Sequence, residues 1–289
     1  MDGSPSLPAS RTVTVGDTAF SYAEAGNGPA LVLLHGIGSA ARSWAPQFAG
    51  LADEFRVIAW DAPGYGGSTP VTPERPDASD YAAALTRLLD ALGVEHLHLV
   101  GHSLGTVTAL RFARQHAKRV RSLTLASLSS GHARLSAQDQ KRLRDARFTD
   151  LEALGPRGMA QKRAPRLLSA GATPAQMQLV LETMSSIDPD GFRQAVWMLS
   201  AADTATGNCP PIVPMRVAAN SSPTGSRRSG SRASSGSPIR SRWCPTTRHR
   251  RATAASASCC CAPPRKARRG PPRLDRAMAL ARHGASRPY

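Results

Sequence analysis

The residues Gly101-His102-Ser103-Leu104-Gly105 place a serine between two glycines, directly after an apolar run. This G-x-S-x-G pattern is typical of a tight turn from a strand into a helix, which presents the serine hydroxyl at the helix N-terminus. A serine hydroxyl is a poor nucleophile at neutral pH, so its chemistry also requires a histidine base and a carboxylate that orients the base. Ser103 is therefore a candidate nucleophile; alternatively, the two glycines only allow a helix to pack closely on a strand.

A second pattern could supply the groups that stabilise an oxyanion. Acyl transfer needs N–H donors aimed at the oxygen on which negative charge develops. The backbone N–H of Leu104 is one candidate, and the N–H of Ile37, within the H-G-I-G sequence at 35–38, is the second. Taken alone, H-G-I-G is also typical of a plain turn, but together with Ser103 it favours an oxyanion-binding loop.

The elements that must position these residues alternate between strands and helices. Residues 11–26 indicate two short strands that turn at Gly16-Asp17. A helix is expected to begin at a Ser79 cap and to end at Gly93. A continuous apolar run predicts a buried parallel strand at 30–36. Further strands are expected near 55–60, 95–102 and 120–128. This alternation predicts an α/β fold, in which a mostly parallel sheet carries helices on both faces.

Helical periodicity replaces the strand pattern after residue 128. Thr173-Pro174 opens one expected helix, with Met177, Leu181 and Met184 on a single stripe. An apolar run at 210–217 then predicts one more buried strand. We divide the chain into four expected parts: an N-terminal core at 1–128, a helical cap at 129–207, a last core strand at 208–217 and a basic low-complexity tail at 218–289.

The net charge of +17 is concentrated in the tail. Residues 218–289 hold 16 Lys and Arg but one acid, Asp275, whereas residues 1–217 hold 21 basic and 19 acidic side chains. The five cysteines also lie late in the chain and form no C-x-x-C pair, so neither a zinc site nor a disulfide framework is indicated. No metal or organic cofactor is expected.

The sequence shows no membrane or export signal. No apolar run reaches the roughly 18 residues of a membrane helix, and the N-terminus lacks a basic region followed by an apolar segment. We therefore expect a cytoplasmic protein without a membrane partner.

The chain resembles the alpha/beta hydrolases through LLHGIGSAARSW, DAPGYGGS and GHSLG, in that order. The resemblance covers residues 11–217 and implies an eight-stranded sheet under a helical cap, with Ser103 as nucleophile and Ile37 and Leu104 as oxyanion donors. The remaining motif residues would support these groups: His35, Gly36, Gly101, His102 and Gly105. The cap sequence is most similar to ester and lactone hydrolases of the 3-oxoadipate enol-lactonase type, which implies a small ester or lactone substrate.

No Asp and no His of a catalytic triad are identified in this sequence. The family places its acid in a loop after the strand at 210–217 and its histidine in a later Gly-His pair, and neither pattern is present. The eight histidines are His35, His96, His98, His102, His116, His132, His249 and His283. The motif positions of His35 and His102 indicate structural roles, and only His132 is expected near the carboxyl edge of the sheet, where a base must lie.

The composition of the tail offers an explanation. Its excess of Arg, Ser, Pro, Ala and Cys is what GC-rich coding DNA yields when it is read out of frame. The third base of each codon, taken with the first two of the next, permits an Asp across Pro223-Thr224 and a His across Ala252-Thr253. Their order and spacing are close to those of the family. We interpret the tail as the product of a single-base slip near Val217 or Ala218, which replaced the last strand, the last helices and two triad members.

Other interpretations stay open. A tail of this composition is typical of a disordered, solvated segment, whatever its origin. A basic tail can also bind nucleic acid through phosphates, although this one has only Trp243 and Tyr289 for stacking and matches no recognition module. A non-catalytic protein of the same fold could bind a small apolar ligand under the cap. Haloalkane dehalogenase chemistry is disfavoured because it requires an aspartate where Ser103 stands.

Overall fold

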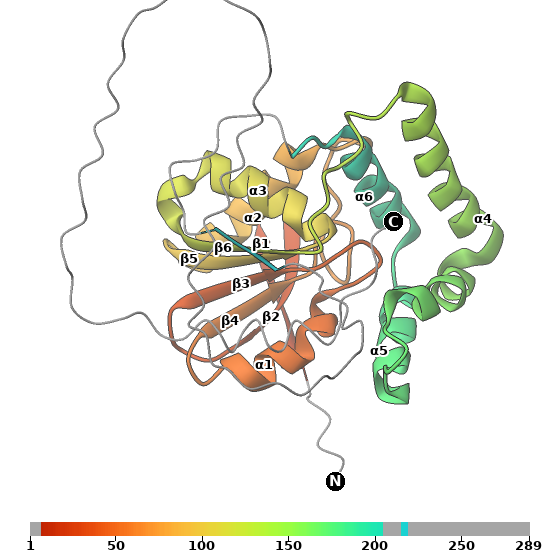
Figure 1. The fold of residues 1–289 in the computed structure, drawn as a ribbon. Helices are drawn as coiled ribbons and strands as arrows, with labels where there is room; N and C mark the ends of the chain where they lie inside the picture. The colour runs from red at the N-terminus through yellow and green to blue at the C-terminus, as the bar shows by residue number, and fades with distance from the viewer. Residues whose placement is uncertain (1–6, 205–214, 219–289) are drawn as a thin grey trace, which may run out of the picture. The chain divides into compact units, whose positions relative to one another are not determined.

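Strands of one sheet form the centre of the molecule (Figure 1). The computed structural model describes residues 7–204 and 215–218. The sheet has the order β1-β2-β4-β3-β5-β6-β7. β1 pairs antiparallel with β2, and β2 with β4, whereas all later pairs are parallel. The strands are β1 (Ser10–Val15), β2 (Thr18–Ala25), β3 (Ala30–Leu34), β4 (Arg56–Trp60), β5 (Leu97–His102), β6 (Val120–Ala126) and β7 (Met215–Ala218).

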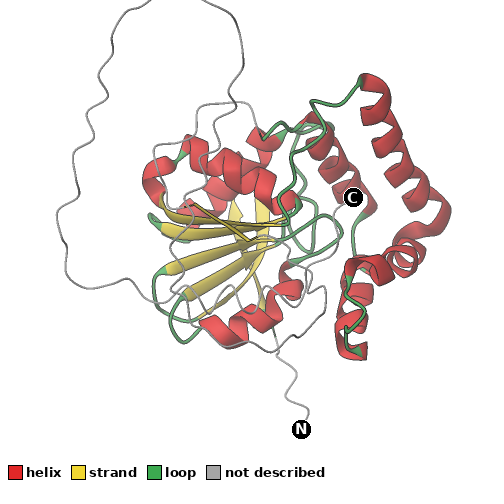
Figure 2. Ribbon diagram, in the orientation of Figure 1, coloured by secondary structure: helices red, strands yellow, loops and turns green. Residues whose placement is uncertain are grey.

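The apolar runs form the inner strands because helices cover both faces of the sheet (Figure 2). Successive side chains of a strand point to opposite faces. Val32 and Leu34 accordingly belong to the larger core cluster, which includes residues of α2 and α3. Leu31 and Leu33 belong to a second cluster, which includes residues of α1. The covering helices are α1 (Ala45–Leu51), α2 (Ala78–Ala91) and α3 (Leu104–Gln115), with short 3₁₀ turns at η1 (Ala41–Trp44) and η2 (Ala117–Arg119).

The predicted cap of α2 was wrong by two residues. Asp77, and not Ser79, is the N-cap, because its carboxylate accepts hydrogen bonds from the amides of Ser79 and Asp80. The Asp80 side chain accepts from the amide of Asp77 in return, which completes a capping box. The expected end of α2 is confirmed, since Gly93 follows Leu92 with a φ of +64°.

Three helices follow β6 and lie beyond the carboxyl ends of the parallel strands (Figure 1). They are α4 (Ala137–Leu167), α5 (Pro174–Ser185) and α6 (Pro189–Ala201). α4 is kinked at Gly155, whose φ of +62° and ψ of 178° are not helical, directly before Pro156. The predicted start of α5 is confirmed: Thr173 caps the helix through the amide of Gln176, and Pro174 is its first residue.

Contacts between segments far apart in sequence attach α6 to the core. A Cβ placed on Gly191 would lie 1.9 Å from the carbonyl oxygen of Gly64, so the two backbones touch. Gln194 donates through Nε2 to the carbonyl oxygens of Val71 and Pro73, at 2.8 and 3.1 Å. These contacts fix α6 against the loop that follows β4.

A cation–π stack adds to this attachment. The guanidinium carbons of Arg75 and Arg144 lie 4.6 and 4.3 Å from the ring centre of Trp197 on α6. Arg75 comes from the loop after β4 and Arg144 from α4. Trp197 therefore joins α4 and α6 to the core.

Several expectations concern residues outside the described part of the chain. The run at 210–217 is described only from residue 215, where β7 extends to Ala218. The eighth strand implied by the resemblance is not among the described residues, and neither are the tail at 219–289, His249, His283 or the frame-slip segments. No helix in the described ranges is long and apolar enough to cross a membrane.

Candidate active site

Ser103 occupies the bend between β5 and α3, with a backbone geometry rare for any residue except glycine. Its φ is +50° and its ψ is −112°. Such a conformation costs of order 1–3 kcal/mol and persists only where the surroundings enforce it. Here the amide of Ser103 donates to the carbonyl oxygen of Ala126 at 3.0 Å, and its carbonyl oxygen accepts from the amide and hydroxyl of Thr106 at 2.9 and 2.6 Å. The strained bend is thus held from β6 on one side and from α3 on the other.

The two glycines of the motif are required by close backbone packing. A Cβ on Gly101 would lie 2.5 Å from the carbonyl oxygen of Gly105. A Cβ on Gly105 would lie 2.3 Å from the carbonyl oxygen of Leu34, at the end of β3. α3 therefore crosses directly over β3 and β5, and Ser103 is placed where these strands end.

The expected oxyanion donors lie at this bend or in the loop beside it. Leu104 is the first residue of α3, where an amide has no acceptor within the helix. A Cβ on Gly36 would lie 3.2 Å from the Cβ of Ser103, so the loop at 35–38 runs directly beside the serine. Ile37, the next residue, is partly exposed, and its amide donates to no acceptor among the described residues. Two N–H donors are thus available near Ser103.

The imidazole of His35 connects this loop to the one after β4. Its Nε2 accepts from the amide of Ala62 at 3.0 Å, so its proton lies on Nδ1, which donates to the carbonyl oxygen of Gly36 at 2.8 Å. Burial lowers the pKa of His35, and the nearby carboxylate of Asp61 only partly opposes this shift. Both nitrogens are engaged, so His35 positions the loop and is not available as a base.

His102 precedes Ser103 and packs against the same loop. A Cβ on Gly36 would lie 2.9 Å from its Nδ1. Burial, with a smaller contribution from His35, lowers the pKa of His102 to about 4. A histidine with this pKa is neutral at pH 7 but is a weak proton acceptor.

The remaining described histidines lie in other environments. His98 pairs with Ser122, and His116 with Thr86; His96 is exposed. The amide of His132 donates to the carbonyl oxygen of Leu199 on α6, and its buried Nδ1 has no partner among the described residues. Burial and the neighbouring Arg147 lower the pKa of His132. The contacts of His132 are thus with α6 and not with the bend at Ser103.

The structure places two further residues near the bend and the loop at 35–38, and the sequence did not indicate either contact. Ser127 follows Ala126, has a φ of +50° and buries its hydroxyl oxygen without a partner among the described residues. Met184 of α5 covers the loop, because a Cβ on Gly38 would lie 3.0 Å from its Cε. Ser127 follows the end of β6, and this position after a predicted parallel strand could have identified it as a residue near the site. The contact of Met184 with Gly38 could not be predicted in this way, because it joins segments that are far apart in the sequence.

The described residues contain no group of three or more His, Cys, Asp or Glu side chains that could hold a metal ion. The candidate groups for chemistry that the structure describes at the bend are the hydroxyl of Ser103 and the backbone amides of Ile37 and Leu104.

Comparison with known proteins gives partial matches to several hydrolases. The chain is 37% identical over 113 residues to a 2-hydroxy-6-oxo-6-phenylhexa-2,4-dienoate hydrolase of Comamonas testosteroni. The matched part covers 38% of this chain and 40% of that protein. The chain thus spans well under two thirds of that relative's length.

Solved structures share the fold over a larger part of the chain. An esterase from Thermogutta terrifontis has a TM-score of 0.59 and 26% identity, and the match covers 68% of this chain and 74% of that one. An enol-lactonase from Burkholderia xenovorans LB400 has a TM-score of 0.58 and 24% identity, with 67% and 75% covered. The family model described as "alpha/beta hydrolase fold" matches residues 29–176. With the sheet order and the bend at Ser103, this match shows that the chain belongs to the alpha/beta hydrolase fold family.

Proposed function

We propose that this protein hydrolyses a small carboxylic ester or lactone through Ser103. The Oγ of Ser103 attacks the carbonyl carbon and loses its proton to a base. The amides of Ile37 and Leu104 stabilise the oxyanion. The oxyanion then collapses with cleavage of the ester C–O bond, and the leaving alkoxide takes the proton from the base. Water then attacks the acyl-enzyme, releases the carboxylate and restores the hydroxyl. The reaction requires no metal or organic cofactor.

The observation that carries the proposal is the enforced backbone strain at Ser103. A serine with a φ of +50° at the start of a helix has no structural advantage over glycine, which adopts this conformation without cost. The hydrogen bonds to Ala126 and Thr106 hold the serine in place. Strain of this kind is typical of active sites, where it presents a reacting group.

The histidine base and its orienting acid are proposed to be lost from this chain, so that water or buffer takes the proton of Ser103 slowly. None of the described histidines both lies at the bend and can act as an effective base. Both ring nitrogens of His35 are hydrogen-bonded, and the lowered pKa of His102 makes it a weak proton acceptor. Loss of the base costs on the order of a million-fold in rate, or about 8 kcal/mol of barrier. The nucleotide sequence of the gene tests the frame-slip hypothesis: stop codons in the shifted frame, or no Asp and His codons there, would refute it.

Turnover of p-nitrophenyl acetate and of a small lactone tests the function itself. We expect slow hydrolysis above the buffer rate by the native chain and none by Ser103→Ala. Ser169→Ala is the matched control, because Ser169 is exposed and lies between α4 and α5. Equal rates for the native chain and Ser103→Ala would contradict the proposal, and saturable ligand binding without turnover would favour the non-catalytic alternative.

A further inference from the structure

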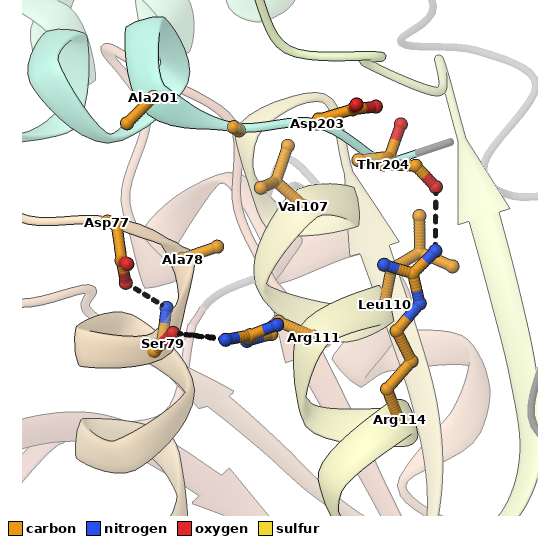
Figure 3. Close-up of a pocket in the computed structure, with 11 residues that line it drawn as sticks. Asp77, Ala78, Ser79, Val107, Leu110, Arg111, Arg114, Ala201, Asp203 and Thr204 are labelled. Carbon is orange, nitrogen blue, oxygen red and sulfur yellow. Dashed lines mark hydrogen bonds between the residues drawn. The ribbon is translucent and has the colours of Figure 1, made fainter. Parts of the chain in front are cut away.

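A pocket that does not include Ser103 in its lining is found where three segments meet. A pocket of about 190 Å³ is formed by the start of α2, one face of α3 and the residues that follow α6 (Figure 3). Its charged lining residues are Asp77, Arg111, Arg114 and Asp203. Arg111 and Arg114 extend from α3 toward opposite walls, Arg111 toward Ser79 and Arg114 toward Thr204.

The guanidinium of Arg111 is only partly used. Its Nε and Nη2 both donate to the hydroxyl oxygen of Ser79, at 3.1 and 2.6 Å. A guanidinium has five N–H donors in a planar fork, so three donors, including both on Nη1, have no acceptor in the described part of the chain. Arg111 also forms no ion pair with a described carboxylate.

The two acids that line the pocket already accept hydrogen bonds. Asp203 accepts from Nε of Arg134 through both carboxylate oxygens, at 3.1 and 3.0 Å. Asp77 accepts from the amides of Ser79 and Asp80 as the N-cap of α2. Arg114 donates through Nη2 to the carbonyl oxygen of Thr204 at 2.9 Å. Arg111 therefore keeps open donors and a positive charge without an ion-pair partner among the described residues.

The sequence supplies little to neutralise this charge. Beyond Asp203 the chain contains one acidic side chain, Asp275. A half-buried guanidinium with an open donor edge prefers a planar or tetrahedral oxyanion, because two parallel N–H groups match two oxygens of one carboxylate or phosphate.

We propose that this pocket binds a small oxyanion, a carboxylate or a phosphate group, on the open edge of the Arg111 guanidinium. Arg114 adds positive charge on the same helix face. Ser103 is not among the lining residues, and the anion takes no part in the hydrolysis proposed above. An anion bound there contacts both α3 and the segment after α6, so it would also stabilise the attachment of α6.

Binding is measured on the full chain by the shift of the thermal unfolding midpoint and by calorimetric titration. Sodium phosphate and sodium acetate are the probes, each compared with sodium chloride at equal ionic strength. We expect a saturable stabilisation, with an apparent Kd about tenfold weaker in Arg111→Gln. Arg111→Lys keeps the positive charge but lacks the planar, parallel N–H donors of a guanidinium, so it should also bind the anions more weakly than the native chain. A response to phosphate alone or acetate alone supports the site and identifies the group that it prefers.

Arg121→Gln is the matched control, because Arg121 is exposed on β6 and its replacement removes the same charge from the chain. Its Kd should equal that of the native chain. Each midpoint is compared with the same variant in chloride, so a general loss of stability in Arg111→Gln does not affect the comparison. The proposal is overturned if neither anion binds the native chain saturably, or if Arg111→Gln and Arg121→Gln bind them equally.

Discussion

The amide of Ser103 donates to the carbonyl oxygen of Ala126 across 3.0 Å, which ties the bend after β5 to the end of β6. This bond, with those from Thr106, holds Ser103 at a φ of +50°. Both the proposed chemistry and a cost in stability follow from this geometry.

Ser103→Gly should be more stable than Ser103→Ala, the reverse of the usual order in folded segments. Glycine adopts a positive φ without steric cost, whereas alanine keeps the strain of the native serine. We expect a difference of about 1–2 kcal/mol in the free energy of unfolding, measured by urea denaturation. Both variants should lack esterase activity. Equal stability of the two would show that the bend is not strained.

Gly105→Ala should destabilise the fold strongly although Gly105 lies within a helix. Alanine in a helix interior is normally favoured over glycine by about 0.5–1 kcal/mol. Here the added Cβ would lie 2.3 Å from the carbonyl oxygen of Leu34, so α3 must move off the sheet. We expect a loss of about 3 kcal/mol or more in urea denaturation.

Gly171→Ala is the control for this steric argument. Gly171 is exposed, and a Cβ there meets nothing within 4 Å. The free energy of unfolding should change by less than about 0.5 kcal/mol. A similar loss for Gly105→Ala and Gly171→Ala would contradict the close packing of α3 on β3.

Stability should fall as the pH is lowered below about 6.5. Burial holds the pKa of His102 at about 4 in the folded chain, while the unfolded chain regains the ordinary value of 6.5. Between these values the unfolded state binds the additional proton, so acid favours unfolding, by at most about 1.4 kcal/mol per pH unit for this histidine. Urea denaturation at several pH values should give a shallower dependence for His102→Gln. The same slope in both proteins would show that His102 is not held neutral by the fold.

Much of the core was predictable because its signals are local. Segments rich in apolar residues predicted β3 to β6, and the glycines around Ser103 predicted the bend. The cap of α2 was misplaced because Asp77 and Ser79 are both good cap residues. Asp77 is the cap because it forms a capping box, while the hydroxyl oxygen of Ser79 accepts a hydrogen bond from Arg111.

Contacts between distant segments left no signal in the sequence. The backbone contact of Gly64 with Gly191 and the cover of Gly38 by Met184 depend on how helices pack on loops. The same holds for the pocket at Arg111, whose walls come from three separate parts of the chain. The kink of α4 has a visible cause in Gly155-Pro156, but its direction is set by packing.

Replacement of residues 218–289 by the shifted reading frame tests the explanation for the missing base. That reading permits an Asp and a His in the order and near the spacing of the family. We expect ester turnover to rise by several orders of magnitude, with an upper limit of roughly a million-fold. The rise should disappear when the restored His is changed to Ala. No gain in turnover would remove the support for a frame slip.

The most direct test of the account is to find the atom that carries the acyl group. The full chain is treated briefly with p-nitrophenyl acetate, quenched in acid and digested, and the acetylated peptides are identified by mass spectrometry. p-Nitrophenoxide leaves without needing a proton, so a missing base slows acylation less than it slows the attack of water on the acyl-enzyme. Acetyl should therefore accumulate on the peptide that contains Ser103, and Ser103→Ala should lose this label while Ser169→Ala keeps it. An acetyl group found only on other residues, or labelling unchanged in Ser103→Ala, would contradict the assignment of Ser103 as the nucleophile.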